Sequence, residues 1–225
     1  MNRFRLTTVR ERRGFTRLGW GVLSGTLVAL IILFTLTIYP FLALTRPAQG
    51  EVLVVEGWLP DYALEKVRDR FQDGNYQSLV TSGGELSVGF HLSRYKTWAQ
   101  LAAATLTAQG VPAEKIITVS APSVKKDRTY ASVLEVKKQL AEKGLFPASI
   151  DVVSLGPHSR RTWMMYQMIF SPDTQVGIYS IRPHNYDPEG WWSSSAGVRT
   201  MIGETIAYLY ARLIFNPPAS TENQS

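Results

Sequence analysis

The side chains that could bind or transform a ligand lie in four short segments, each of which follows an apolar run of the sequence. If those runs are parallel strands of one sheet, the segments meet at its carboxyl edge, where open α/β sheets bind ligands. Cations, a glycine-rich turn and a histidine together suit an anionic ligand. The candidate ligand-binding residues are Gly57, Ser82, Gly83, Gly84, Arg128, Thr129, His158, Arg160 and Arg161.

Two of these segments place arginines where helices are expected to begin. Arg128 precedes one predicted helix, and Arg160 and Arg161 open another. The amino end of a helix carries partial positive charge, so cations are disfavoured there. An anion between the two helix ends would remove this repulsion, and free helix amides are natural anion ligands. The alternative is that these arginines face solvent or pair with acids such as Asp127 and Asp173; we favour the anion site.

His158 and Glu56 are the candidates for acid–base chemistry. A histidine exchanges its proton near neutral pH, and a carboxylate that ends a strand can act as a base. Neither has a second convergent acid at a recognisable spacing, so the catalytic residues stay undefined. The Ser82-Gly83-Gly84 turn lacks the lysine of a P-loop and the spacing of a dinucleotide site, so no cofactor is indicated. We assign no metal site, because the chain has no cysteine and no H-x-x-x-H pair. Glu56 and Glu85 could hold a divalent cation at this edge, but solvated acids are the default interpretation.

The elements that must position these residues alternate between β-branched apolar runs and amphipathic stretches. Such alternation predicts a mostly parallel sheet covered by helices on both faces, and hence a Rossmann-like three-layer α/β sandwich. The predicted strands are 51–55, 78–81, 116–119, 150–155 and 176–181, and the predicted helices are 61–72, 93–109, 129–143, 159–170 and 198–215.

An uncharged stretch from Leu18 to Leu44 precedes this α/β part. Its core, Leu18 to Tyr39, would span roughly 33 Å as a helix, which is enough to cross a bilayer. A cleaved signal peptide is the alternative, but its apolar region is shorter, about 7–15 residues. Six arginines precede the stretch, so we expect a single-pass anchor in a bacterial cytoplasmic membrane, with a cytoplasmic N-terminus and a periplasmic or otherwise extracytoplasmic domain.

Charge and composition limit the partners. The formal charge is +6, but residues 1–17 hold six arginines and one glutamate, so the rest of the chain is nearly neutral. A basic tail of this kind suits an anionic leaflet and excludes a nucleic-acid surface on the domain. Gly21, Gly25 and Ala29 share one helix face and predict a weak homodimer. The predicted divisions are a cytoplasmic tail 1–17, an anchor 18–44, a linker 45–50, an α/β domain 51–215 and a disordered tail 216–225.

Several of these motifs together resemble the YdcF-like family, which includes the SanA and ElyC envelope proteins. The similarity covers about residues 51–182 and rests on the order and spacing of short motifs. These motifs are the strand Val52-Leu53-Val54-Val55 that runs into Glu56-Gly57, Val80-Thr81-Ser82-Gly83-Gly84, Gly110-Val111-Pro112 with Ile116, Asp127-Arg128-Thr129 and His158-Ser159-Arg160-Arg161, which is similar to H-x-x-R. The resemblance implies a Rossmann-like fold and a role in the cell envelope.

The chain also departs from the family pattern. Thr129 is followed by Tyr130, Ala131 and Ser132 rather than by T-x-E-N, and Trp98 replaces a usual acid. Both changes favour binding over catalysis. The expected function is therefore binding of an anionic, phosphate-bearing ligand, such as a cell-wall lipid intermediate. The alternatives are a hydrolase or transferase acting on such a ligand, and a non-catalytic structural partner.

Overall fold

The computed structural model describes residues 14–217, and the chain divides into two compact units between Thr37 and Ile38. Most of the predicted tails 1–17 and 216–225 lies outside the described residues. Helix α1, Arg17–Leu42, is long and apolar enough to cross a membrane. Its residues up to Thr37 still give about 30 Å of helix, the thickness of a hydrocarbon core.

The last turn of α1 belongs to the globular unit rather than to the apolar span. Ile38 and Leu42 are buried in a cluster with Tyr186, Trp191 and Met201. The predicted anchor 18–44 therefore includes residues that pack with the domain. Periodicity could not reveal this, because side chains that face lipid and side chains that face a protein core are equally apolar.

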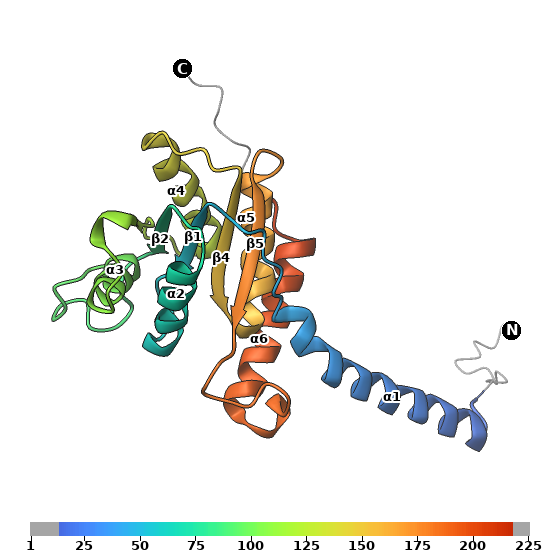
Figure 1. The fold of residues 1–225 in the computed structure, drawn as a ribbon. Coiled ribbons are helices and arrows are strands. Elements are labelled where there is room, and N and C mark those ends of the chain that lie inside the picture. Colours follow the sequence, from blue (N-terminus) through green and yellow to red (C-terminus); the bar gives the residue numbers. More distant parts are fainter. Residues whose placement is uncertain (1–13, 218–225) are drawn as a thin grey trace, which may run out of the picture. The chain divides into compact units, whose positions relative to one another are not determined.

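The globular unit is an α/β domain built on five parallel strands, in the order β3-β2-β1-β4-β5 (Figure 1). The prediction of a parallel sheet is confirmed. β1 and β4 are neighbours in the sheet although they are not consecutive in the chain, so the strand order reverses between them. The strands are β1 Val52–Glu56, β2 Ser78–Gly83, β3 Ile116–Ser120, β4 Ser149–Leu155 and β5 Gln175–Ile181.

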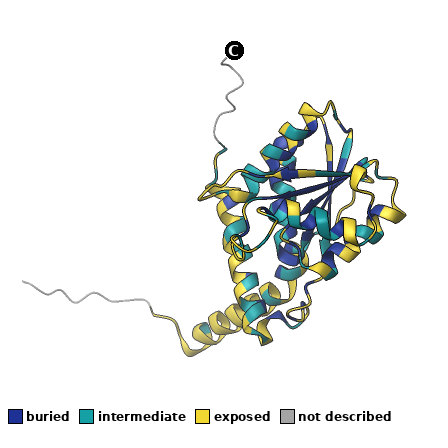
Figure 2. Cartoon of the chain, turned by 90° about the vertical axis from the view of Figure 1, so that its left-hand side faces the viewer, coloured by how far each residue is buried: buried dark blue, intermediate teal, exposed yellow. Residues whose placement is uncertain are grey.

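Helices cover both faces of the sheet, and the strands lie buried between them (Figure 2). On one face, α2 and α3 pack on alternate residues such as Leu53 and Val55. On the other face, α4, α5 and α6 pack on residues such as Val54 and Val152. Burial on both faces explains why the strands read as unbroken apolar runs. The helices are α2 Asp61–Asp73, α3 Trp98–Ala108, α4 Arg128–Glu142, α5 Ser159–Phe170 and α6 Ser195–Leu213.

Two helices begin elsewhere than the sequence predicts, because each starts at a side-chain cap. α3 begins at Trp98 rather than near residue 93, since the Thr97 hydroxyl accepts a hydrogen bond from the Gln100 amide at 3.2 Å. α6 begins at Ser195 rather than residue 198, since Ser194 accepts from the Gly197 amide at 3.1 Å. Caps of this kind satisfy amides that the helix itself leaves free.

The linker after the anchor is held by one buried carboxylate. Asp151 in β4 accepts hydrogen bonds from the amides of Ala48 at 2.7 Å and Gly50 at 2.8 Å, and from the Tyr76 hydroxyl at 3.0 Å. Gly177 on the adjacent strand leaves space for the Asp151 side chain, because a Cβ at this position would lie 2.0 Å from Asp151 Oδ1. Asp151 thus fixes the route by which the chain enters the sheet.

Replacing Asp151 with alanine should destabilise the domain strongly, because two backbone amides lose their only acceptor in this arrangement. We expect a loss of about 3 kcal/mol in the free energy of unfolding, by the usual values for hydrogen bonds to charged groups. Tyr76→Phe removes only one donor and should cost about 1 kcal/mol. Urea unfolding of the full chain in detergent measures both. Equal losses for the two variants would contradict the role assigned to Asp151.

Candidate functional site

A cleft of about 800 Å³ opens at the carboxyl edge of the sheet. Its walls come from the segments that follow β1, β2 and β3, from the first turns of α4 and α5, and from α6. It adjoins the point where the strand order reverses, which is where open α/β sheets bind ligands. The structure brings together in this cleft the predicted residues Glu56, Ser82, Gly83, Gly84, Arg128, Thr129, His158 and Arg161.

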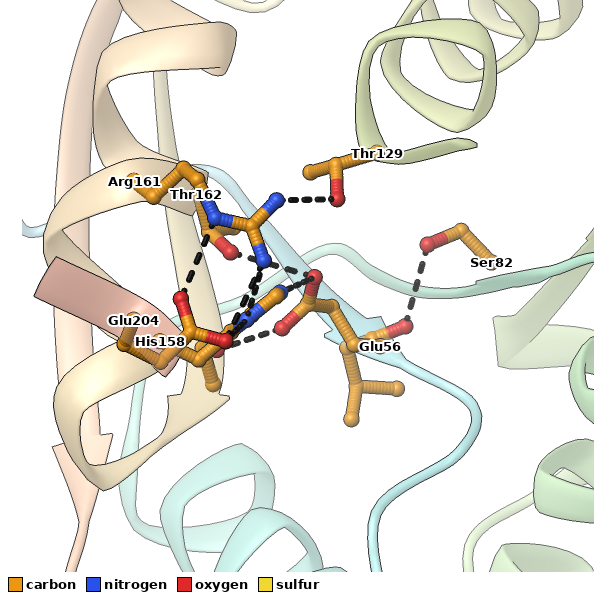
Figure 3. A network of polar contacts seen from close by, with 9 residues as sticks. Glu56, Ser82, Thr129, His158, Arg161, Thr162 and Glu204 are labelled. Atoms are coloured by element: carbon orange, nitrogen blue, oxygen red, sulfur yellow. Dashed lines mark hydrogen bonds and ion pairs between the residues drawn. The ribbon is translucent and has the colours of Figure 1, made fainter. Parts of the chain in front are cut away.

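Glu56, the last residue of β1, is a buried carboxylate on the floor of the cleft (Figure 3). It accepts hydrogen bonds from the hydroxyls of Ser154 and of Thr162, the latter at 3.1 Å. His158 Nε2 lies 3.3 Å from Glu56 Oε1. Burial alone would raise the pKa of Glu56, but the charge and hydrogen bonds of His158 and Ser154 outweigh it and lower the pKa.

His158 lies between two carboxylates. Its Nε2 faces Glu56, and its Nδ1 lies 2.9 Å from Oε1 of Glu204 in α6 (Figure 3). Burial disfavours the charged imidazole, yet the two carboxylates prevail and raise the pKa of His158 to about 9. His158 is therefore an imidazolium at neutral pH, and both of its ring nitrogens donate a hydrogen bond.

Glu204 is shared by His158 and Arg161. Arg161 Nε lies 3.1 Å from Glu204 Oε2, and Arg161 Nη2 lies 3.2 Å from Glu204 Oε1. The same guanidinium donates through Nη1 to the Thr129 hydroxyl at 3.2 Å, which connects α5 and α6 to α4. Burial opposes the charge of Glu204, but His158 and Arg161 lower its pKa to about 2. Arg161 Nη2 and His158 Nδ1 lie only 2.9 Å apart although both carry protons, and the negative charge of Glu204 offsets the repulsion between them.

These contacts revise the expectation of an anion between the helix ends. The acid that pairs with Arg161 is neither Asp127 nor Asp173 but Glu204, 43 residues further along the chain. The protein itself thus supplies the negative charge that the start of α5 requires. We call Glu56, His158, Arg161 and Glu204 the buried charge network.

Two predicted site residues lie elsewhere. Arg160 is not among the residues that line the cleft; its guanidinium stacks 3.9 Å from the ring centroid of Phe41 and donates to the Phe41 carbonyl. Gly57 packs against α3, where a Cβ would lie 2.5 Å from the Trp98 carbonyl oxygen. Gly57 is thus required for close approach of the backbone, and it does not line the cleft.

Sequence reasoning missed Glu204 as a functional candidate. It is the only acidic residue of α6. A single acid within an apolar helix was the available signal. Tyr166 was missed as well: its hydroxyl is buried at the wall of the cleft. Burial, followed by the charge of Glu56, raises the pKa of Tyr166.

The rim of the cleft carries cations that, unlike His158 and Arg161, are not paired with carboxylates of the described residues. Lys125, Lys126 and Arg128 are exposed, and within residues 14–217 none of them forms an ion pair with a carboxylate. They lead into α4, whose N-cap residue Asp127 has a left-handed backbone (φ 55°) and gives no side-chain cap. The first amides of α4 are therefore available to a ligand.

The described part of the chain shows no group of three or more histidine, aspartate or glutamate side chains that could hold a metal ion. The chain also matches no protein-family model and no curated protein. The site must therefore be interpreted from its own geometry.

The state of His158 predicts how stability depends on pH. Its pKa in the folded protein, about 9, exceeds the ordinary 6.5, so the folded state binds its proton more tightly than the unfolded state. This contribution is complete below about pH 6.5 and is lost as the pH rises to about 9. Its size should be on the order of 2–3 kcal/mol.

Urea unfolding near pH 6 and near pH 9 measures this loss. His158→Gln should reduce the difference between the two conditions, whereas His184→Gln, at an exposed position, should retain it. A His158→Gln variant with the same pH dependence as the unmodified chain would show that His158 is not the group responsible.

Proposed function

We propose that this chain is a membrane-anchored protein whose α/β domain lies outside the cytoplasm and binds an anionic, phosphate-bearing ligand. The ligand would belong to cell-wall or lipid-carrier metabolism in the bacterial envelope. Support for the location comes from the apolar helix α1 and from the arginines that precede it in the sequence. The strand order, with its reversal between β1 and β4, supports a Rossmann-like assignment. The resemblance to YdcF-like proteins is consistent with both.

The proposal that the ligand is a phosphate-bearing anion rests on one observation. Three exposed cations without carboxylate partners, Lys125, Lys126 and Arg128, lie on the rim of the cleft at the uncapped start of α4. Phosphate oxygens accept hydrogen bonds from free helix amides and from arginine, and their charge is favoured at a helix amino end. His158 and Arg161 contribute less than the sequence indicates, because Glu56 and Glu204 already neutralise them.

A second candidate function, a hydrolase or transferase acting on the same ligand, is favoured by the state of His158. This residue lines the cleft and is an imidazolium at neutral pH, so it could donate a proton to a leaving oxygen once one of its hydrogen bonds to Glu56 or Glu204 opens. Glu56 would then keep the imidazole charged and oriented. Phosphate release from a polyprenyl diphosphate, lost in Glu56→Gln, would establish this activity.

Pairing of two chains through Gly21, Gly25 and Ala29 stays a prediction. These residues lie in the apolar part of α1, and a Cβ at Gly21 or Gly25 would meet no other group within 4 Å. Close approach of a second helix is therefore sterically possible along this face.

Arg128→Ala should weaken binding of pyrophosphate and of a short polyprenyl phosphate roughly fivefold, which corresponds to about 1 kcal/mol for an exposed charged contact. Arg160→Ala is the matched control, because it removes the same charge from a residue outside the cleft. Titration calorimetry of the full chain in detergent compares the variants, and thermal unfolding verifies that both are folded. Equal affinity losses in the two variants, or no binding of either probe to the unmodified chain, would refute the proposed site.

A further inference from the structure

We propose that α6 is a second membrane contact: its exposed apolar face lies on the bilayer surface next to the anchor and holds the domain against the membrane. The inference rests on the proposed anchoring through α1. It adds that the domain is not a freely tethered body but docks on lipid through a defined surface.

The contact surface is a narrow stripe along α6. It consists of Ile202, Ile206, Leu209 and Leu213, which we call the α6 stripe. Their spacing of four, three and four residues places all of them on one helix face. Their side chains are 53%, 63%, 47% and 75% exposed, respectively. The opposite face of α6, with Met201 and Ala211, is buried in the domain. A contiguous apolar surface of this kind on a soluble domain indicates an interaction site.

The occupant follows from where the chain leaves the membrane. Ile38 and Leu42 of α1 pack with Met201 of α6 inside the globular unit, and Phe41 contacts Tyr208 with ring centroids 5.4 Å apart. The first compact unit of the chain ends at Thr37, directly before these contacts. The preceding apolar part of α1 is therefore covalently joined, within one helical turn, to residues that touch α6, so a bilayer that holds α1 is within reach of this helix.

The surroundings of the α6 stripe also suit a lipid surface. Arg199 and Arg212 are exposed at either end of α6 and can contact lipid phosphates. Trp192 and Tyr210 are 47% and 40% exposed, and such residues are typical of membrane interfaces. A second copy of the chain fits less well. The only acid of α6, Glu204, is committed to the buried charge network, so two facing α6 helices would present arginines to each other without a carboxylate to pair with them.

The absence of cysteine from the chain makes a labelling experiment direct. Single cysteines at Ile206 or Leu209 would carry the fluorophore NBD in the full chain, reconstituted into phosphatidylethanolamine–phosphatidylglycerol vesicles. Thr107→Cys, exposed on α3 at the other face of the sheet, is the control for an aqueous position. Leu27→Cys reports whether α1 is in lipid. Lipids brominated on their acyl chains quench only labels that touch the membrane.

Docking predicts a blue-shifted emission and several-fold stronger quenching at both stripe positions than at Thr107. Water-like emission at both stripe positions, with Leu27 quenched, would overturn the docking and leave the anchor intact. A blue shift that brominated lipids do not quench, and that fades on dilution of the protein in the vesicles, would assign the α6 stripe to a second copy instead. If the label at Leu27→Cys is not quenched, α1 does not lie in lipid, and both the anchor and the docking are refuted.

Discussion

The burial of one carboxylate, that of Glu56 at the end of the central strand β1, determines how this edge of the domain is built. A buried charge is costly unless it is paired and hydrogen-bonded. Ser154 and Thr162 supply hydroxyls, and His158 supplies a positive charge. The charged imidazole in turn requires Glu204. Glu204 also pairs with Arg161, and Arg161 Nη1 donates a hydrogen bond to Thr129. One buried acid thus fixes the relative positions of β1, β4, α4, α5 and α6.

The buried charge network separates two tasks within the cleft. On the floor, two cations and two carboxylates satisfy one another, so the contribution of these groups is mainly to hold the elements in place. On the rim, Lys125, Lys126 and Arg128 remain without carboxylate partners in the described part of the chain, beside the open amides of α4. In the proposed function, attraction for the anion therefore comes from the rim. Both ring nitrogens of His158 already donate to carboxylates, so proton transfer to a ligand would require one of these two hydrogen bonds to open.

The sequence predicts which strands and helices build this site better than it predicts which side chains pair within it. Apolar runs and amphipathic periods locate the five strands and the α-helices that cover them, because burial of one face leaves a local pattern. Placing His158, Arg128 and Glu56 at one sheet edge also follows from reading what comes after each strand. The partner of Arg161 does not follow, because Glu204 lies 43 residues away and reaches it only through the packing of α6 on α5. Arg160 and Arg161 are adjacent in sequence, yet one helical step turns the first onto Phe41 and the second into the cleft.

A crystal structure of the protein with pyrophosphate would show whether an anion binds at the rim while the buried charge network stays closed. We expect phosphate oxygens within hydrogen-bond distance of Arg128, of Lys125 or Lys126, and of the first amides of α4. We also expect that Glu204 remains bonded to both His158 and Arg161. Pyrophosphate bound to Arg161 in place of Glu204, or bound outside the cleft altogether, would contradict the proposed site.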